Sequence, residues 1–600
     1  MDSLEMYPQP DFARYRWLNL NGVWKFAFDD KGIGIKERWY MGLEESAGEA
    51  LKRIRVPYSY ESLCSFVDKE LFDNENHELM WYEREVEIHN SDLSKGHVLL
   101  HFGAVDYSCR IWINGIYIGE HIGGSTHFYY EVENALHDGQ NRITVMARDS
   151  YDAEQLRGKQ CWSPKLTRCW YTPTSGIWRN VWLEFTGERY FTRLHVITDI
   201  DQGTATVLMR INKDIDQKER GLDAEYVIRR NNDVVSQGNM SVLTNNMQVT
   251  VKIEPDDYID NTHLWSPEHP TLYVIELLLI QRGQELDRVS SYFGMRRVES
   301  YNGHILLNHE EIYQRLVLDQ GYWPDGIMTP PDKNSFHKDL LAAKQMGFNG
   351  VRMHQKFEDP QFYYEAAKLG MLVWGECPSA YVASDVSFEN ILREWTEFIN
   401  ERFNDPAIIV WVPLNESWGM RDIFDNALQQ QRAKAIFNLT KALDPTRLIS
   451  TNDGWETIAD SDIIGIHDYE DNPETLTERY KDINNFFNIG IGYKQPICKG
   501  NSYKNQPFLI TEYGGISLQD SNKNNWGYHE KVNGTDEYLK IMKSLTSTIQ
   551  KIPYCCGFCY TQLTDVMQET NGLLTAEREN KADIAELNSI FSAKLNPVKP

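Results

Sequence analysis

Short apolar runs alternate with helical patterns through the second half of the chain, and this alternation limits the fold more than any other feature. From about residue 300 onward the candidate strands are IYQRLVL, GVRMH, MLVWGE, IIVWVPL, RLIST, IIGIHDY, FLITEYG and CGFCYTQL. Between them, residues 387–403 place apolar side chains at helical spacing, and Gly370 ends a second helical pattern. Eight βα units over residues 298–600 predict a closed (β/α)8 TIM barrel.

The first 297 residues carry a different pattern, in which turn residues separate short strand-like runs. Runs such as GVWKFAF, HVLLHF and NRITVMA, with a turn at Asn114–Gly115, predict an N-terminal jelly-roll-like β-sandwich over residues 1–186. Residues 187–297 repeat this style in TATVLMRI, AEYVIRR, MQVTVKI and TLYVIELLLI. Their length and spacing predict a second, immunoglobulin-like β-sandwich. The chain is therefore expected to be a multidomain protein with its barrel last.

Net charge and hydropathy limit the binding partners and the cellular compartment that we expect for this chain. With 61 basic and 87 acidic residues the net charge is −26, which repels phosphate groups, so we expect neither a nucleic-acid nor a membrane partner. The start MDSLEMYPQPDFARYRW shows no signal-peptide pattern, and no 18 apolar residues run together. Nine cysteines in a chain of this size indicate free thiols. We expect a cytoplasmic protein, and the sequence leaves a homo-oligomer open.

One cysteine cluster invites a metal interpretation. The run YCCGFC contains Cys555, Cys556 and Cys559 within an apolar, strand-like segment. Because alternate strand residues face opposite sides, these thiols are not expected to converge on one ion. We therefore predict no metal site at this run.

The chemistry of a TIM barrel lies at the carboxyl ends of its strands. The predicted strands end in carboxylate, amide, imidazole and hydroxyl groups: Arg352, His354, Glu376, Asn415, Glu416, His467, Asp468, Tyr469, Glu512, Tyr513, Tyr560, Gln562 and Asp565. Such a set, with almost no lysine, suits a polyhydroxylated neutral ligand. It points to a sugar rather than to a charged metabolite.

Glu416 and Glu512 stand out because they follow strands four and seven, which face each other across an eight-stranded ring. A glycosidase needs such a pair: one carboxyl protonates the leaving oxygen and the other, ionised, attacks the anomeric carbon. Their proximity is expected to raise the pKa of the acid and keep it protonated. A single strand-end glutamate is more often an ordinary ion-paired residue, but two at opposed ends favour catalysis.

Neighbouring side chains complete the predicted pocket. Asn415 is placed to hydrogen-bond the sugar 2-hydroxyl, and Tyr469 to hold the nucleophile ionised and aimed. Trp374 and Tyr560 are expected to form a wall under the sugar ring, although Trp374 fits core packing equally well. The full set of predicted sugar-binding residues is Asn415, His354, Glu376, Tyr469, His467, Tyr560, Asp319, Trp323, Trp170 and Asn571.

Motifs in order along nearly the whole chain carry a family resemblance. They are NLNGVWKFAF, VPYSYES and TSGIWRNVWLE in the first region, LWSPEHPTLY and FGMRRVE in the second, and DLLAAKQMGFNGVRMHQ, AAKLGMLVWGE, VWVPLNESWG and ITEYGG in the third. The chain resembles glycoside hydrolase family 2, the family of β-galactosidases, β-glucuronidases and β-mannosidases. That resemblance implies a retaining exo-glycosidase with Glu416 as acid/base, Glu512 as nucleophile and no cofactor.

Departures from the family pattern bear on specificity. Where many relatives carry G-V-N-x-H, this chain has RLVLDQGYWPDG, so Asp319 and Trp323 are expected to shape the pocket. In the first sandwich, LTRCWYTPTSG offers Arg168 and Trp170 where galactosidase-type members reach the sugar with an acidic residue.

The sugar-carboxylate motif of glucuronidase-type members is also altered. They use an Asn-x-Lys pair, whereas ETNGLLTAE has Asn571 followed by Leu573. This weakens the uronate interpretation. Four other cations keep it open: Lys499, Lys504, Arg578 and Lys581.

The leading hypothesis is a β-galactosidase that removes a terminal sugar from an oligosaccharide or glycoside by double displacement. A β-glucuronidase or an α-L-arabinofuranosidase of the same family is the alternative. A non-catalytic carbohydrate-binding protein is a further alternative, but it would have less need of both glutamates. A barrel enzyme for a phosphorylated metabolite draws some support from Gly514–Gly515, which follow strand seven.

Overall fold

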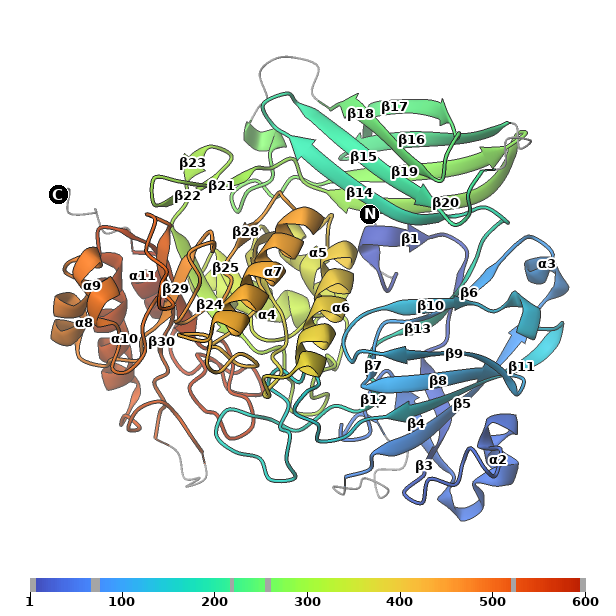
Figure 1. Ribbon diagram of the computed structural model, residues 1–600, viewed down its shortest axis with the longest axis horizontal. Coiled ribbons are helices and arrows are strands. Elements are labelled where there is room, and N and C mark those ends of the chain that lie inside the picture. The colour runs from blue at the N-terminus through green and yellow to red at the C-terminus, as the bar shows by residue number, and fades with distance from the viewer. Residues whose placement is uncertain (1–6, 66–75, 216–220, 254–260, 520–524, 594–600) are drawn as a thin grey trace.

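The computed structural model describes residues 7–65, 76–215, 221–253, 261–519 and 525–593. They form two β-sandwiches and one barrel, seen in Figure 1 as blue, green and yellow-to-red bodies. This confirms the predicted multidomain fold, with a jelly-roll-like sandwich, an immunoglobulin-like sandwich and a TIM barrel in that order. The boundaries drawn at residues 186 and 297 stay predictions.

The first sandwich packs a six-stranded sheet, ordered β4-β3-β5-β11-β8-β9, against a four-stranded sheet, ordered β10-β6-β13-β2. A two-stranded pair of β12 and β7 lies beside them. The strands are β2 (Trp17–Asn19), β3 (Gly22–Phe28), β4 (Lys52–Val56), β5 (Leu79–Ile88), β6 (Val98–Phe102), β7 (Val105–Asp106), β8 (Ser108–Ile113), β9 (Ile116–Ile122), β10 (Phe128–Glu131), β11 (Gly139–Arg148), β12 (Gly176–Ile177) and β13 (Val181–Phe185). Apolar side chains from both sheets form its core.

The second sandwich packs a five-stranded sheet, ordered β1-β20-β19-β16-β17, against a three-stranded sheet, ordered β14-β15-β18. Its strands are β1 (Ala13–Arg14), β14 (Phe191–Asp199), β15 (Thr204–Ile211), β16 (Leu222–Arg230), β17 (Asp233–Ser241), β18 (Asn246–Lys252), β19 (Tyr273–Gln281) and β20 (Gln284–Phe293). Strand β1 comes from the N-terminal segment and pairs with β20. The start of the chain therefore ties the two sandwiches together. A small sheet of β21 (Val298–Tyr301), β22 (His304–Leu307) and β23 (Glu310–Glu311) leads into the barrel.

Every strand run predicted in the second half forms a barrel strand. In chain order these are β24 (Gln314–Asp319), β25 (Gly350–Met353), β26 (Leu372–Glu376), β27 (Ile408–Val412), β28 (Leu448–Ile449), β29 (Ile464–His467), β30 (Phe508–Gly514) and β31 (Cys555–Thr561). They pair in parallel from β28 through β24 to β29. The backbone N–H of Asp462 donates to the carbonyl of Ile449 at 2.9 Å and links the two ends of the ring.

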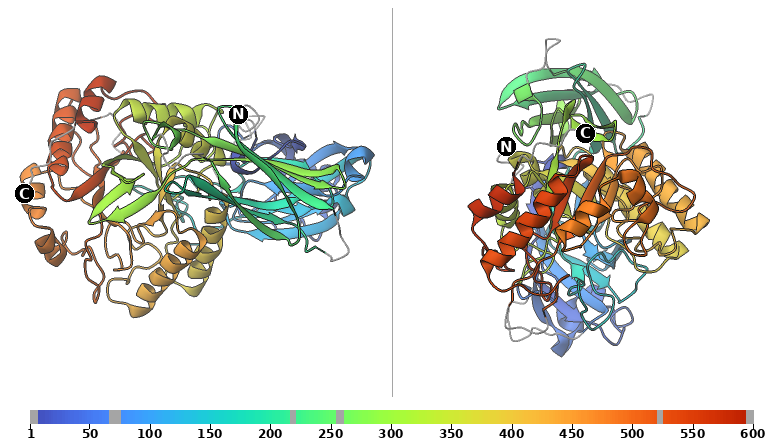
Figure 2. Two further views of the ribbon diagram at one scale, coloured as in Figure 1. Left: turned by 90° about the horizontal axis from the view of Figure 1, so that it is seen from above. Right: turned by 90° about the vertical axis from the view of Figure 1, so that its left-hand side faces the viewer.

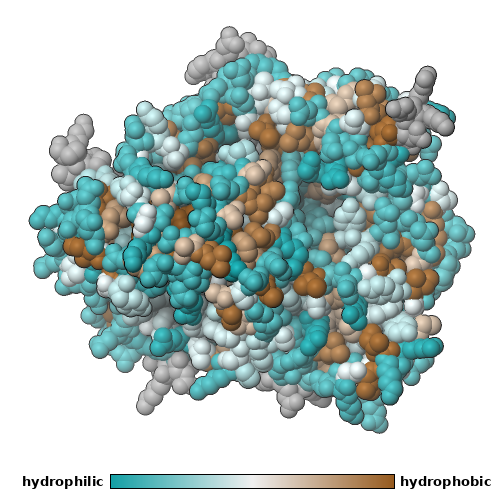
Figure 3. Space-filling view, viewed as in Figure 1, coloured by the Kyte–Doolittle hydropathy of each residue, from teal (hydrophilic) through white to brown (hydrophobic). Residues whose placement is uncertain are grey.

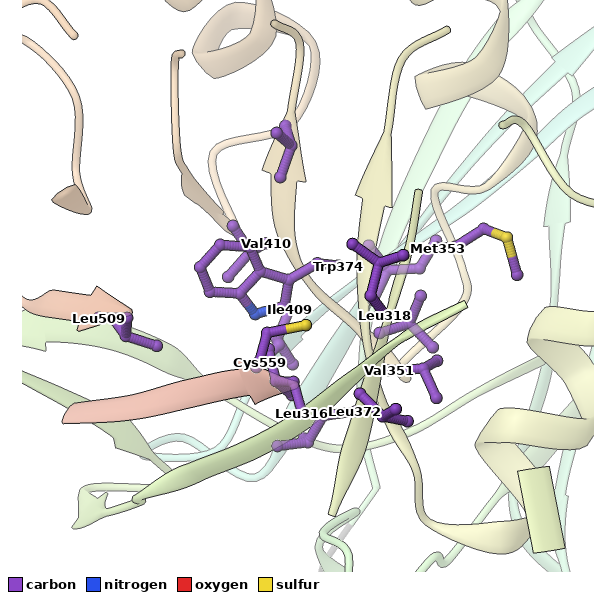
Figure 4. Packing of buried hydrophobic residues seen from close by; sticks show 14 of the residues in the cluster. Leu316, Leu318, Val351, Met353, Leu372, Trp374, Ile409, Val410, Leu509 and Cys559 are labelled. Atoms are coloured by element: carbon purple, nitrogen blue, oxygen red, sulfur yellow. The ribbon is translucent and has the colours of Figure 1, made fainter. Parts of the chain in front are cut away.

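Residues on the inner side of these strands fill the barrel. Leu316, Leu318 and Val410 lie there with Trp374 and Cys559 (Figure 4). Trp374 is fully buried and donates to Gln314 Oε1 at 2.7 Å. The expectation that Trp374 walls the sugar is therefore wrong, because its ring is part of the core beneath the strand ends.

Helices cover the outside of the barrel, as both views in Figure 2 show. They are α4 (Ser335–Gln345), α5 (Pro360–Leu369), α6 (Asp385–Glu401), α7 (Ala427–Leu443), α8 (Pro473–Arg479), α9 (Ile483–Ile489), α10 (Thr535–Gln550) and α11 (Ile584–Phe591). The spacing of Ile391, Trp395 and Phe398 makes one buried stripe on α6. Gly370 ends α5 with φ 68°, the left-handed C-terminal position that favours glycine.

The hydropathy of the surface and the state of the cysteines fit the composition of the chain. Hydrophobic residues on the face shown in Figure 3 lie in small patches among hydrophilic ones. None of the nine cysteines forms a disulfide, and the three of the YCCGFC run lie buried in β31. Among the residues described, no helix has the length and apolarity needed to span a bilayer.

Candidate active site

Two glutamates face each other at the carboxyl ends of opposed barrel strands. Glu416 follows β27, and its φ of 52° turns the chain sharply; its N–H donates to Asp453 O at 2.8 Å. Glu512 lies within β30. One carboxyl oxygen of each glutamate and a ring nitrogen of His467 all lie within 4.8 Å of one another. The side chain of Glu416 is 22% exposed and that of Glu512 only 4%, so Glu416 is the more open to the mouth.

Glu512 is fixed from two sides. Arg352 Nη1 donates to its Oε1 at 2.6 Å, and the Tyr469 hydroxyl donates to its Oε2 at 2.6 Å. Burial raises the pKa of Glu512, but the charges of His467 and Arg352 outweigh it and hold the pKa below its ordinary value. Glu512 is therefore ionised, and neither oxygen is free to rotate out of place.

The pKa of Glu416 is shifted in the direction opposite to the one predicted. Its Oε1 lies 2.8 Å from His467 Nδ1, and Trp418 Nε1 donates to its Oε2 at 3.3 Å. Burial raises the pKa of Glu416, yet the hydrogen bond and charge of His467 bring it below its ordinary value. The predicted rise in the pKa of the acid is therefore wrong for the unliganded site, because an imidazolium stands between the two carboxylates.

His467 holds the proton instead. Burial lowers its pKa, but Glu512 and the hydrogen bonds to Asp453 and Glu416 raise it to about 10. Its Nε2 lies 3.1 Å from Asp453 Oδ2 and 3.3 Å from Glu512 Oε1. Both ring nitrogens therefore carry hydrogen and face carboxylates at neutral pH.

Arg352 organises the floor of the site. It is fully buried, and its Nη2 donates to Asn415 Oδ1 at 2.7 Å. Its Nε lies 2.9 Å from Glu376 and its Nη2 3.3 Å from Asp453. One cation thus positions the amide beside the acid and three carboxylates. Asp453 was not among the predicted site residues, although it closely follows the run RLIST at the end of strand five.

His354 and Glu376 lie at the same floor. His354 Nδ1 is 3.2 Å from Glu376 Oε1 and 4.0 Å from Glu512 Oε1. Burial, with the nearby charge of Arg352, lowers the pKa of His354, so its ring is neutral. Burial raises the pKa of Glu376 to about 8, against the charge of Arg352. These two residues support the nucleophile from below.

Three predicted sugar-binding residues lie elsewhere. Tyr560 packs against Phe591 of α11 with ring centroids 5.3 Å apart, and its neighbour Thr561 instead lies 3.2 Å from the Tyr469 hydroxyl. The prediction for Tyr560 is wrong, because side chains alternate along a strand and Thr561 takes the inward position.

Asp319 and Trp323 also face away from the two glutamates. Asp319 accepts from Gly321 N at 2.9 Å, and burial together with the charge of Asp339 on α4 raises its pKa to about 7. Trp323 packs edge-on to Phe336 of the same helix at 5.4 Å. Both predictions are wrong, because the segment after β24 folds back onto α4 rather than over the sugar pocket.

A loop of the first sandwich reaches the barrel mouth. In Figure 1 the cyan segment between β11 and β12 extends from the sandwich toward the barrel. Trp170 on this loop donates to the Tyr381 hydroxyl at 2.8 Å and packs edge-on to Trp418 at 5.5 Å. Because Trp418 also contacts Glu416, Trp170 lies on the acid's side of the site.

Asn571 lies where this loop meets the segment after β31. Its Nδ2 donates to Glu569 Oε1 at 3.1 Å, and Tyr171 donates to Glu569 Oε2 at 2.6 Å. Gln568 Nε2 donates to the carbonyls of Arg168 and Trp170 at 2.7 and 2.8 Å. The two domains therefore build this edge of the pocket together.

Lys159, on the same sandwich loop, was missed. It is 7% exposed, and its charge acts on Glu416, Glu512 and Glu569. Nothing in the local sequence marks it, because the loop is polar and lies about 250 residues before the acid in the chain.

The four cations that the sequence offered as partners for a sugar carboxylate are either paired with other residues or exposed. Arg578 pairs with Asp339 at 3.0 Å and Lys581 with Asp565 at 2.6 Å, whereas Lys499 and Lys504 are exposed. Leu573 is fully buried. The glycines Gly514 and Gly515, considered as a phosphate loop, pack against the rings of Tyr560 and Tyr528.

Two groups among the described residues have a spacing that would suit a metal ion: His97, Glu131 and Glu133, and the trio of Glu416, His467 and Glu512. In the trio, the two ring nitrogens of His467 face carboxylate oxygens, Nδ1 that of Glu416 and Nε2 that of Asp453. The first group lies on the sandwich, away from the barrel mouth.

Paired carboxyl groups at this separation in the mouth of a TIM barrel define the site type of the retaining glycosidases, whose carboxyls stand about 5–5.5 Å apart. Three family models then cover most of the chain. "Glycosyl hydrolases family 2, sugar binding domain" matches residues 17–186, "Glycosyl hydrolases family 2" matches 189–296, and "Glycosyl hydrolases family 2, TIM barrel domain" matches 302–594. The chain belongs to glycosyl hydrolase family 2.

Curated relatives are more distant than this family match suggests. A Formosa agariphila protein, named provisionally as a β-glucuronidase, is 28% identical over 381 residues, which are 61% of this chain and 44% of that protein. A β-galactosidase of Thermoanaerobacter pseudethanolicus is 26% identical over 413 residues, 68% of this chain and 51% of its own length. The chain spans about half the length of these relatives.

Solved structures share the fold over their full length. A β-glucuronidase of an uncultured Clostridium species superimposes with a TM-score of 0.77 at 20% identity, covering 96% of this chain and 98% of the other. A β-galacturonidase of Eisenbergiella tayi, bound to glycerol, gives a TM-score of 0.74 at 18% identity and 98% coverage of both. These likenesses establish the three-domain architecture.

Proposed function

We propose that this protein is a retaining exo-β-glycosidase that hydrolyses a terminal sugar from an oligosaccharide or glycoside. The observation that carries the proposal is the approach of one carboxyl oxygen of Glu416 and one of Glu512 to within 4.8 Å. An inverting mechanism needs carboxyl groups about 6.5–9.5 Å apart to hold the attacking water, so this shorter approach suits direct attack by one carboxylate.

Glu512 is the nucleophile in this proposal. Held by Arg352 and Tyr469, its carboxylate attacks the anomeric carbon, while Glu416 gives a proton to the departing glycosidic oxygen. Water then hydrolyses the glycosyl-enzyme ester, with Glu416 taking its proton. Because the family's barrel model also includes both residues, a hydrolase is better supported than a carbohydrate-binding protein.

The proton for the first step is stored next to the acid. In the unliganded site it resides on His467, one hydrogen bond of 2.8 Å from Glu416. Transfer along that hydrogen bond loads Glu416 and leaves a neutral imidazole bound to Asp453. Asn415, its carbonyl oxygen held by Arg352, presents its amide N–H to the sugar 2-hydroxyl.

Galactose is the terminal sugar that the sequence favoured, and the curated relatives include β-galactosidases. A β-uronide is the second candidate, and one observation favours it: a loop of the first sandwich holds the buried Lys159 against the barrel, where its charge acts on both glutamates. The names of the structural relatives, which include β-glucuronidases and a β-galacturonidase, agree with it.

The proposal is tested with Glu416→Gln and Glu512→Gln on a panel of 4-nitrophenyl β-glycosides. Each variant should lose about 10³-fold or more in kcat while keeping the wild-type melting temperature. Proton NMR of the first sugar released should show the β-anomer. Release of the α-anomer, or near-native rates in both variants, would refute double displacement.

A further inference from the structure

The loop that carries Lys159 is anchored to the barrel by its backbone. Arg157 and Gly158 both donate to the carbonyl of Ser379 at 3.0 Å, and the Tyr381 hydroxyl donates to the carbonyl of Gly158. Gly158 has φ 56°, and a Cβ there would lie 2.1 Å from Gln355 O. The next residue, Lys159, is therefore held against the loops that follow β25 and β26.

The ammonium of Lys159 is buried, with the Cys169 side chain as a hydrogen-bond partner and no described carboxylate in direct contact. No carboxylate oxygen of the described residues lies within 4.0 Å of it, although the side chain is only 7% exposed. Its nearest ring is Tyr171, whose centroid is 5.7 Å from Nζ. Burial lowers its pKa, but Cys169 and then the carboxylates of Glu569 and Glu512 raise it above the ordinary value. Lys159 is charged at neutral pH.

Two other described cations near the mouth are already paired with carboxylates. Arg352 is shared among Glu376, Asp453 and Glu512. Lys581 is paired with Asp565, as shown above. Leu573, two residues after Asn571, is apolar and fully buried. Among these three described cations, Lys159 is the one with no carboxylate oxygen within 4.0 Å.

We infer that Lys159 binds the carboxylate of the sugar, so that the substrate is a β-linked uronic acid and the sandwich domain supplies the specificity residue. The inference rests on the proposed glycosidase function. A buried ammonium is stabilised far more by an anion at hydrogen-bond distance than by a neutral hydroxyl. A 6-carboxylate provides that anion, whereas the 6-hydroxymethyl group of galactose leaves the charge unpaired.

The experiment compares matched substrates: 4-nitrophenyl β-D-glucuronide and β-D-galacturonide against the glucoside and galactoside. For wild-type protein, kcat/KM on one uronide should exceed that on its neutral counterpart by about 100-fold or more. Lys159→Met should lose about 100-fold more on that uronide than on its neutral counterpart, so that the preference for the uronide disappears. Lys159→Arg should keep part of the preference because it keeps the charge.

Lys504→Met is the control, since it removes an exposed lysine and should leave all four rates unchanged. A wild-type preference for a neutral glycoside, or an equal loss on both classes in Lys159→Met, would overturn the inference and leave the glycosidase proposal standing. If Lys159→Met fails to fold, the wild-type ratio and Lys159→Arg decide. Failure of the glycosidase proposal has another signature: no glycoside is cleaved, or Glu512→Gln remains active.

Discussion

His467 sets the protonation of the site, because its charge lies between Glu416 and Glu512. Replacing it with glutamine keeps a hydrogen-bonding group and removes the positive charge. The pKa of both glutamates should rise, since the lowering by His467 is lost. We expect the acid limb of the kcat/KM profile to move up by about 1–3 pH units in His467→Gln.

The control for this profile is His304→Gln, which removes an exposed histidine paired with Glu311 at 2.8 Å. Its acid limb should coincide with that of the wild type. An unshifted limb in His467→Gln would show that the two glutamates owe their low pKa to other groups, such as Arg352.

The same histidine links stability to pH. Its folded pKa of about 10 lies above the ordinary 6.5, so its stabilisation is complete below pH 6.5 and is lost as pH rises through 10. The glutamates have lowered pKa values, so their contribution is present above pH 4.5 and is lost as pH falls. The melting temperature should therefore fall between pH 7 and 10, and His467→Gln should flatten this fall.

Tyr469 and Tyr513 offer a matched pair of phenols. Tyr469 donates to Glu512, whereas Tyr513, in β30, faces the helix layer and lies 2.8 Å from Thr546 Oγ1. Tyr469→Phe should lower kcat by about 10- to 100-fold, since a hydrogen bond to a charged group is lost. Tyr513→Phe should change stability but not kcat. Equal kcat values in the two variants would remove Tyr469 from the mechanism.

At the scale of elements, the loop between β11 and β12 depends on one glycine. A Cβ at Gly158 would collide with the barrel backbone, whereas Gly48 has a similar φ of 54° and nothing within 4 Å. Gly158→Ala should displace the loop and lower kcat/KM at least about tenfold. Gly48→Ala carries the same backbone strain, about 1 kcal/mol, without the collision and should keep full activity. The assay is kcat/KM with a melting curve for each variant.

The barrel strands show which structural features a local sequence pattern can predict. The eight barrel strands were predictable because each is a continuous apolar run, buried on both faces. Because such a run is apolar on both faces, the sequence does not show which side chains face the barrel axis. Tyr560 was therefore assigned to the pocket although Thr561 points there, and Trp374 lies in the core.

At the scale of the whole molecule, the N-terminal segment links the two sandwiches through Arg14. Its guanidinium pairs with Glu184 of β13 and, at 3.0 Å, with Asp287 of β20. All three side chains are buried. Arg14→Met should destabilise this junction by about 3–5 kcal/mol, because two buried carboxylates lose their partner.

Arg16→Met is the matched control two residues away. Arg16 pairs with Asp92 at 3.2 Å on the surface, where a salt bridge contributes about 0–1 kcal/mol. Calorimetry should show a lower first transition in Arg14→Met alone. Equal melting curves for the two variants would show that the junction tolerates the unpaired carboxylates.

The chain's apolar periodicity and strand-end residues were enough to specify the three-domain architecture and to single out Glu416, Glu512, Asn415 and Tyr469, because those signals depend on neighbours close in sequence. The tertiary structure decided the rest. The proton that the sequence predicted on Glu416 resides on His467 instead, because three carboxylates from separate strands converge on that imidazole. Lys159 reaches the site because a sandwich loop docks on the barrel. Burial and charge act through space, and no local pattern records which distant residues will share one pocket.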